Sequence, residues 1–377
     1  LRGTAATTIL NEVVGANASQ LRGYTEVAGQ AARVIVANPY GISCNGCGFI
    51  NTPQVTLTTG KPVLDAYGQL QRFNVQGGSI SIDGVGLNAD NVDQFDIITR
   101  SAKINAELHA KRLNIIAGRN DVDAQTLNPT AKPELAVDSS ALGGMYAGAI
   151  RLVGTEAGVG VRLAGDLAAS GGDIQIDANG HLSMTQTAAS GAVTARASSA
   201  EVNGPVYAGS SLTMSAARDA LSLSAGGQLN NSAVIEAGVN ADNSRNGSGD
   251  VTLSANGLTN SGSITASRAL QATITQTLNN QGATLNGQSG RILSQGGTVD
   301  INASQVLNSQ SGLISSNGTM TITAGSLDNS QQGKLFSSSA LSARISGPLL
   351  NQLGLISANG DLLLNAASVD NRNAEIS

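Results

Sequence analysis

The sequence of 377 residues has no tryptophan, and aromatic residues make up only 2% of it. Charged residues are also scarce, at 12% against the roughly 25% of an average soluble domain. The formal net charge is -5, so the chain lacks the basic excess that binds nucleic acids or anionic membranes. We therefore expect no nucleic acid among its partners.

Long apolar segments and a visible targeting signal are missing too. No apolar run reaches the ~18 residues of a membrane-spanning helix, and no basic segment followed by an apolar one opens the chain. Leucine rather than methionine comes first, so we expect a fragment or a processed product with any export signal upstream. Disorder is not indicated either, because 41% of the residues are hydrophobic and regularly placed.

Motifs for catalysis and metal binding are missing as well. The two histidines, His109 and His181, stand in no motif with serine, cysteine or carboxylates, and there is no G-x-S-x-G, H-E-x-x-H or phosphate-binding loop. We expect no catalytic residue, no metal and no cofactor here. Four aspartates lie near one another without the spacing of an EF-hand, so only their proximity favours calcium: Asp83, Asp90, Asp93 and Asp96.

Repeats are present instead, most clearly in the C-terminal half. Residues 257–280, 306–329 and 349–371 share an apolar-x-Asn segment, then Gly-x-Ile, then alternating apolar residues. The asparagine recurs at intervals of 29, 20, 28, 21, 22 and 20 residues, a base period of 20 to 22 with loops inserted at 241–250 and 285–295. The recurring residues are Asn231, Asn260, Asn280, Asn308, Asn329, Asn351 and Asn371.

Apolar residues alternate within each unit, for example Met320, Ile322 and Ala324. A period of two predicts strands. Three short strands per unit, separated by corners rich in Asn, Gly and Ser, predict a parallel β-helix with coils of about 20 residues. Such a small coil cannot offset the entropy of ordering its backbone, so we expect coils to fold only by stacking.

The repeated asparagines are expected at the corners of the coils. Asparagine tolerates left-handed backbone, and its amide can form a ladder of hydrogen bonds along the stack. A glycan or ligand site is the alternative interpretation. The sequons at Asn246, Asn302 and Asn317 have the same structural interpretation, since no glycosylating compartment is evident.

The N-terminal half alternates in the same way without so clear a repeat, at residues 32–38, 54–60, 78–84 and 173–180. We expect the same helix there, with irregular coils and a few loops or hairpins outside it. Residues 128–135 contain two of the seven prolines and form the expected extruded loop, because proline cannot donate to a central ladder.

Cys44 and Cys47 are the only cysteines and stand three residues apart. A redox pair would open a helix after a strand, and a zinc site would need a second pair of ligands; neither condition is met. A tight disulfide that closes an exposed loop and a pair of reduced buried thiols remain. Just before them, Asn38, Pro39, Tyr40 and Gly41 fit a type I turn, with proline fixing φ and glycine closing it.

Four ordered segments carry a family resemblance: ILNEV (9–13), QLRGYTEVAGQAARVIVANPYGISCNGCGFIN (20–51), QFDIITRSAKINAELHAKRLNIIAGRND (94–121) and GGMYAGAIRLVGTEAGVGV (143–161). Together they resemble the two-partner secretion domain of filamentous-haemagglutinin-like exoproteins. The remainder resembles the haemagglutinin repeats that follow that domain. The resemblance implies a secretion domain at 1–165 that lacks its extreme N-terminus, irregular coils at 166–228, and repeats at 229–377 that continue beyond the chain.

The resemblance also implies a right-handed parallel β-helix on the surface of a Gram-negative bacterium. Its partner would be an outer-membrane transporter of the Omp85 type, which recognises the secretion domain. The family's Asn-Pro-Asn-Gly turn falls on Asn38, Pro39, Tyr40 and Gly41, where Tyr40 replaces the second asparagine. Paired cysteines of haemolysin and contact-dependent-inhibition members match Cys44 and Cys47, which favours the disulfide.

Three functional classes share such a stalk. The segments CNGCGFIN and SAKINAELHAKRLNIIAGRND look most like contact-dependent growth-inhibition exoproteins, which carry a variable toxin at the far C-terminus. Such a protein would also have a receptor on a target cell and an immunity protein for its toxin. A filamentous adhesin and a pore-forming haemolysin are the alternatives.

Overall fold

The computed structural model describes residues 4–129, 141–142, 145–154, 161–163, 165–178, 180–197, 199–202, 206–209, 211–216, 228–231, 234–238, 244–281 and 289–377. In these ranges every regular element is a β-strand. No helix in the described ranges is long and apolar enough to span a membrane. The chain divides into two compact units, Leu1–Ser183 and Met184–Ser377.

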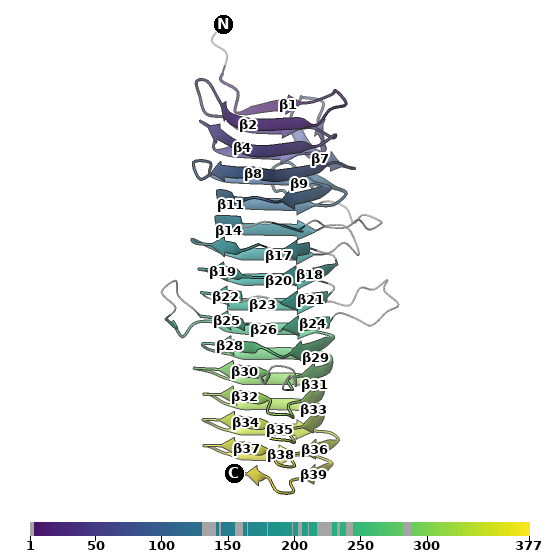
Figure 1. Ribbon diagram of the computed structural model, residues 1–377, viewed down its shortest axis with the longest axis vertical. Coiled ribbons are helices and arrows are strands. Elements are labelled where there is room, and N and C mark those ends of the chain that lie inside the picture. Colours follow the sequence, from purple (N-terminus) through teal and green to yellow (C-terminus); the bar gives the residue numbers. More distant parts are fainter. Residues whose placement is uncertain are drawn as a thin grey trace. The chain divides into compact units, whose positions relative to one another are not determined.

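The N-terminal unit is a stack of parallel strands on three faces (Figure 1). Its first face contains β1 (Thr8–Glu12), β3 (Arg33–Ala37), β5 (Gln54–Thr58), β9 (Gln94–Thr99), β11 (Leu108–Ala117), β14 (Met145–Gly154) and β17 (Ile174–Ala178). Its second face contains β2 (Ser19–Glu26), β4 (Ile42–Ile50), β8 (Ser79–Ala89), β10 (Ser101–Ile104), β13 (Ala141–Leu142), β15 (Val161–Leu163) and β18 (His181–Met184). The third face continues β2, β4 and β8 past a bend and adds the first halves of β11 and β14 and strand β16 (Leu167–Ala169).

The C-terminal unit repeats this three-faced arrangement. The first face contains β20 (Val193–Ala197), β23 (Ser211–Ala216), β26 (Asp250–Ala255), β29 (Leu270–Asn279), β31 (Val299–Leu307), β33 (Met320–Asp328), β35 (Leu341–Ile345) and β38 (Leu362–Asn365). The second contains β21 (Ser199–Val202), β24 (Gln228–Asn231), β27 (Gly257–Asn260), the second halves of β29, β31 and β33, then β36 (Pro348–Leu350) and β39 (Ser368–Asp370). The third contains β19 (Thr187–Ala189), β22 (Val206–Ala208), β25 (Val234–Ala237), β28 (Ser263–Ala266), β30 (Arg291–Ser294), β32 (Leu313–Ser316), β34 (Lys334–Ser337), β37 (Leu355–Ala358) and β40 (Glu375–Ile376).

Strand register measures the length of each coil. In the C-terminal unit, Leu270, Val299, Met320, Leu341 and Leu362 are successive partners, so the steps are 29, 21, 21 and 21 residues. The parallel β-helix and its coil of about 20 residues, predicted from the sequence, are confirmed. The long step contains the insertion expected at 285–295, of which 285–288 lie outside the described residues.

The interior of the helix is built from one column of apolar side chains per face. On the third face, Ile292, Ile314, Leu335 and Ile356 are register partners, and all four are fully buried. Each lies between equivalent side chains of the coils above and below, because period-two alternation turns every second residue inward. The core therefore forms only when coils stack.

A small antiparallel sheet covers the outside of the first face in the N-terminal unit. It consists of β6 (Lys61–Leu64), β7 (Leu70–Val75) and β12 (Asn120–Asp123). Phe73, Val75 and Val122 of this sheet are fully buried in one cluster with Ile35 and Ile98, which point outward from the helix. The expected hairpin outside the helix thus has its own apolar core. The loop expected at 128–135 lies outside the described residues from residue 130 onward.

Candidate functional site

The Asn38 turn joins β3 to β4 and is held by its own backbone and by one side chain. The Gly41 amide donates to the Asn38 carbonyl at 3.1 Å, which closes a four-residue turn, and the Tyr40 amide donates to Oδ1 of Asn38 at 2.9 Å. Asn38 is fully buried, and its Nδ2 donates to the Asn17 carbonyl and to Oγ of Ser19, both at 2.9 Å. One asparagine thereby fixes both the turn and the preceding coil.

The tyrosine at position 40 leaves this network intact. Its side chain is 54% exposed, and only its backbone amide takes part in the turn. Gly41 has φ of +114°, and a Cβ there would lie 3.1 Å from the Ser79 carbonyl oxygen. Glycine is therefore required at position 41, whereas position 40 presents an exposed aromatic side chain.

Cys44 and Cys47 form a disulfide with a Cα separation of 5.4 Å. The prediction that the disulfide closes an exposed loop is wrong. Both cysteines lie within β4, and Cys44 is 0% and Cys47 4% exposed. The register of β4 against β8 shifts between Asn45 and Cys47, so the disulfide spans a bulge. Gly46 supplies the positive φ of +67° that the bulge needs.

The repeated asparagines of the C-terminal unit form one continuous ladder. Each Nδ2 donates to Oδ1 of the next asparagine at 2.7 to 2.8 Å, from Asn231 through Asn371. All except the last, exposed Asn371 are at most 2% exposed. The same Nδ2 groups donate to backbone carbonyls near the start of the third-face strands, for example that of Asn329 to the Leu355 carbonyl at 3.0 Å. The buried amides are therefore satisfied by bonds that run along the stack. The members are Asn231, Asn260, Asn280, Asn308, Asn329, Asn351 and Asn371.

The ladder explains the glycine at the corner that follows four of its asparagines, Asn280, Asn308, Asn329 and Asn351. A Cβ on Gly333 would lie 2.7 Å from both the carbonyl oxygen and Oδ1 of Asn329. Gly312 has the same relation to Asn308, with hypothetical Cβ distances of 2.6 Å to Oδ1 and 2.7 Å to the carbonyl. No side chain fits at these corners while the asparagine keeps its hydrogen bonds.

The four aspartates of the acidic segment do not gather into a calcium site. Asp83 accepts from Nδ2 of Asn105 at 2.8 Å, a hydrogen bond that lowers the pKa of its carboxyl, and Asp93 pairs with Lys111 at 3.2 Å. Across the described ranges no group of three or more His, Cys, Asp or Glu could hold a metal ion.

Asp96 instead belongs to a buried polar network that the sequence did not indicate. Its Oδ2 accepts from Gln54 at 2.7 Å and Thr56 at 3.1 Å, and its Oδ1 accepts from Gln94 at 3.0 Å and Asn114 at 2.9 Å. Thr56 and Asn114 are the register partners of Asp96 on the two neighbouring strands. Polar residues at equivalent outward positions of successive strands are the sequence signal that could have revealed this network.

Arg33 connects this network to the covering sheet. Its Nη2 donates to Oγ1 of Thr56 and its Nη1 to the Ala124 carbonyl, both at 2.8 Å. Burial lowers the pKa of the Arg33 guanidinium, and the charge of Asp96 opposes that shift. The arrangement ties the loop after β12 to the outer side of the helix.

Two family models match the chain. The TPS secretion domain matches residues 2–184, and the haemagglutinin repeat matches residues 246–297, 291–346 and 340–377. A solved structure, the filamentous hemagglutinin secretion domain, is 29% identical with a TM-score of 0.40, over 61% of this chain and 71% of that one.

Curated relatives match the chain at higher identity. The 16S rRNA endonuclease CdiA of Enterobacter cloacae subsp. cloacae is 54% identical over 218 residues, 56% of this chain and 6% of that protein. The tRNA nuclease CdiA of Yersinia mollaretii is 45% identical over 271 residues, 67% of this chain and 9% of that protein. The chain thus spans less than a tenth of the length of either relative. With its TPS secretion domain followed by haemagglutinin repeats, the chain belongs to the two-partner secretion exoproteins of the CdiA and filamentous haemagglutinin type, which are secreted to the outer-membrane surface.

Proposed function

We propose that this chain is the secretion domain and the first part of the stalk of an exoprotein that delivers a toxin to neighbouring bacteria. The observation that carries the proposal is the TPS secretion domain, followed by repeats whose register is fixed coil by coil. The relatives named as nucleases support toxin delivery. Any toxin would lie C-terminal to these residues, so the chain itself is not the enzyme.

The transporter of the Omp85 type is the first partner in this proposal. The geometry of the Asn38 turn (Asn38, Pro39, Tyr40 and Gly41) supports a role in recognition, because the buried Asn38 side chain anchors it to the preceding coil and holds its backbone in one conformation. The disulfide between Cys44 and Cys47 lies in the next strand and shapes the bulge beside it. An immunity protein for the toxin and a receptor on the target cell complete the proposed set of partners.

The turn can be tested by export. Replacing Pro39 and Gly41 together (Pro39→Ala with Gly41→Val) should leave the chain in the periplasm, whereas Tyr40→Asn should export normally, because only the amide of residue 40 holds the turn. Immunoblots of periplasm and cell surface give the result. Circular dichroism of the purified double variant then distinguishes a lost contact from a lost fold. Normal export of the double variant would contradict the role of the turn.

Toxin delivery is tested by competition in co-culture. A producer strain and the same strain without this gene are each mixed with a neighbour that lacks immunity, on a surface and across a cell-impermeable filter. We expect the neighbour to be lost only in contact and only with the intact gene. Survival in every mixture, together with weaker attachment of the mutant to surfaces, would replace toxin delivery with adhesion, the function that the haemagglutinin repeats alone support.

A further inference from the structure

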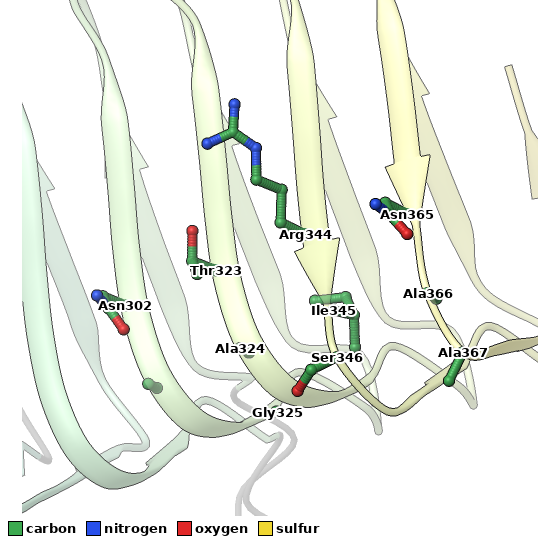
Figure 2. A pocket seen from close by; sticks show the side chains of 11 residues that line it. Asn302, Thr323, Ala324, Gly325, Arg344, Ile345, Ser346, Asn365, Ala366 and Ala367 are labelled. Atoms are coloured by element: carbon green, nitrogen blue, oxygen red, sulfur yellow. The ribbon is translucent and has the colours of Figure 1, made fainter.

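A groove lies along the outer side of the C-terminal unit, where strands bend from the first face to the second. Its lining comes from β31, β33, β35 and β38 and the turns after the last two, and its volume is about 620 Å³. Figure 2 shows Asn302, Thr323, Arg344 and Asn365 in a row on these strands, with small residues at the bend below them. The row follows the strand register, so one side chain comes from each coil.

At the base of the groove the backbones of successive coils approach each other closely, which leaves no room for a large side chain. Among the lining residues, a Cβ on Gly325 would lie 2.5 Å from the Ser304 carbonyl oxygen. Ser346 and Ala367 are the corresponding lining residues on the next two coils. A side chain at position 325 would displace backbone, so glycine keeps the groove open at that coil, and the small side chains of Ser346 and Ala367 leave it open at the next two.

The groove has a positive charge without a counterion. Arg344 is the only charged residue in its lining, and it is exposed. Within the described ranges its guanidinium has no hydrogen bond or ion pair, unlike Arg268, which pairs with Asp250, and Arg372, which pairs with Asp370. The remaining polar groups of the row are the amides of Asn302 and Asn365 and the hydroxyl of Thr323. Asp300, on the same sheet face, is two strands away from Arg344.

Strand addition by a peptide is not possible at this site. Each of β31, β33 and β35 is paired on both sides, so no backbone edge is free to accept another strand. What the groove offers is a row of side-chain donors and acceptors that repeats every ~4.8 Å, the spacing of neighbouring strands. That repeat is close to the length of one sugar unit in a linear polysaccharide, and hydroxyl groups match the amide and threonine groups.

We propose that this groove binds a linear polysaccharide that carries carboxylates, with one sugar per coil and a uronate carboxylate paired to Arg344. Guanidinium and carboxylate form a bidentate, charge-assisted pair, which suits an exposed arginine without a partner. The groove presents no aromatic ring for stacking, so the charge rather than apolar contact distinguishes this ligand from a neutral glycan. The binding site is independent of toxin delivery and of the transporter.

The test measures binding of a fluorescent oligogalacturonate to the 377-residue chain by polarisation. Arg344→Gln should raise the dissociation constant about tenfold, because a charge-assisted hydrogen-bonded pair is lost. Arg291→Gln is the matched control, since Arg291 is exposed on β30 of another face and changes the net charge equally. Arg344→Lys should give an intermediate value, because lysine keeps the charge without the planar fork.

Several results would overturn the proposal. Equal weakening by Arg344→Gln and Arg291→Gln would indicate general electrostatic attraction rather than a site. Equal binding of neutral dextran would remove the role of the carboxylate, and Arg344-dependent binding of poly-glutamate of the same length would make the groove a peptide site. Absence of oligogalacturonate binding by the unaltered chain would reject the polysaccharide outright.

Discussion

At the scale of single residues, the asparagine ladder makes the most specific demand on the sequence. Asn329 accepts from Asn308 and donates to Asn351, and it is fully buried. Asn329→Ala removes both links and leaves buried polar groups unpaired, so we expect a loss of about 2 kcal/mol or more in the free energy of unfolding. Urea denaturation followed by circular dichroism measures it. Asn317→Ala is the control, because Asn317 is exposed and outside the ladder; equal losses would contradict the ladder's contribution.

The ion pair between Asp250 and Arg268 makes the free energy of unfolding of the C-terminal unit depend on pH. Nε of Arg268 donates to Asp250 at 2.7 Å, and this hydrogen bond lowers the pKa of the Asp250 carboxyl. Because the folded pKa lies below the unfolded one, the stabilisation is complete above the unfolded pKa and is lost as the pH falls through the folded pKa.

Asp250→Asn should therefore lower the melting temperature more at about pH 6 than at about pH 3, where the native carboxyl is partly protonated as well. Asp361→Asn, which changes an exposed aspartate, serves as the control and should shift both melting temperatures alike. An equal effect of Asp250→Asn at the two pH values would show that the pair does not contribute to folding.

At the scale of elements, the repeat was predictable, whereas hairpins outside the helix were expected without a position and the pairing within the covering sheet was not predictable. The sequence interval between ladder asparagines lies within one residue of the coil length wherever no loop intervenes, and equals it between Asn308 and Asn329. Alternation therefore identified the strands, and the recurring asparagine identified the coils and their corners. The covering sheet joins β7 to β12, and Phe73 pairs with Val122 across 49 residues. No local pattern encodes that pairing, because it depends on which outward positions of the helix are apolar.

The candidate site shows the same division between local and distant information. The Asn38 turn was predictable from Asn38, Pro39 and Gly41, since turn residues act through their own backbone. The burial of Cys44 and Cys47 was not, because the bulge that spans them is defined by register against β2 and β8 on neighbouring coils. Domain boundaries at 165 and 228 stay a prediction.

The covering sheet should contribute to stability through its own core. Phe73 is fully buried against Ile35, Ile98 and Ile116. Phe73→Ala should cost about 3 kcal/mol or more in the free energy of unfolding and expose the hairpin to proteolysis. Tyr67→Ala is the matched control in the turn between β6 and β7, where the tyrosine is 91% exposed. If the two variants unfold at the same urea concentration, the covering sheet is not coupled to the helix.

At the scale of the whole molecule, the stacking of coils suggests how the exoprotein could leave the cell. A single coil cannot fold alone, but each coil that adds to an existing stack contributes a further interface and so stabilises the whole stack. If coils fold as they emerge outside the transporter, each new coil opposes backward movement of the chain without nucleotide hydrolysis. Export and coil stacking would then be coupled, and a defect in one central coil would lower the amount of protein on the surface.

Ile322→Pro tests this coupling. Ile322 is fully buried in β33, which pairs with β31 and β35 on its two sides, so proline removes a ladder donor and interrupts both pairings. We expect less surface protein and more in the periplasm on immunoblots, and the same from Ile264→Pro in β28, which also lies between two partners. Ile322→Val keeps the backbone donor and should export normally. Export of the proline variants at the level of the unaltered chain would show that stacking does not drive the movement outward, whatever the Asn38 turn contributes to recognition.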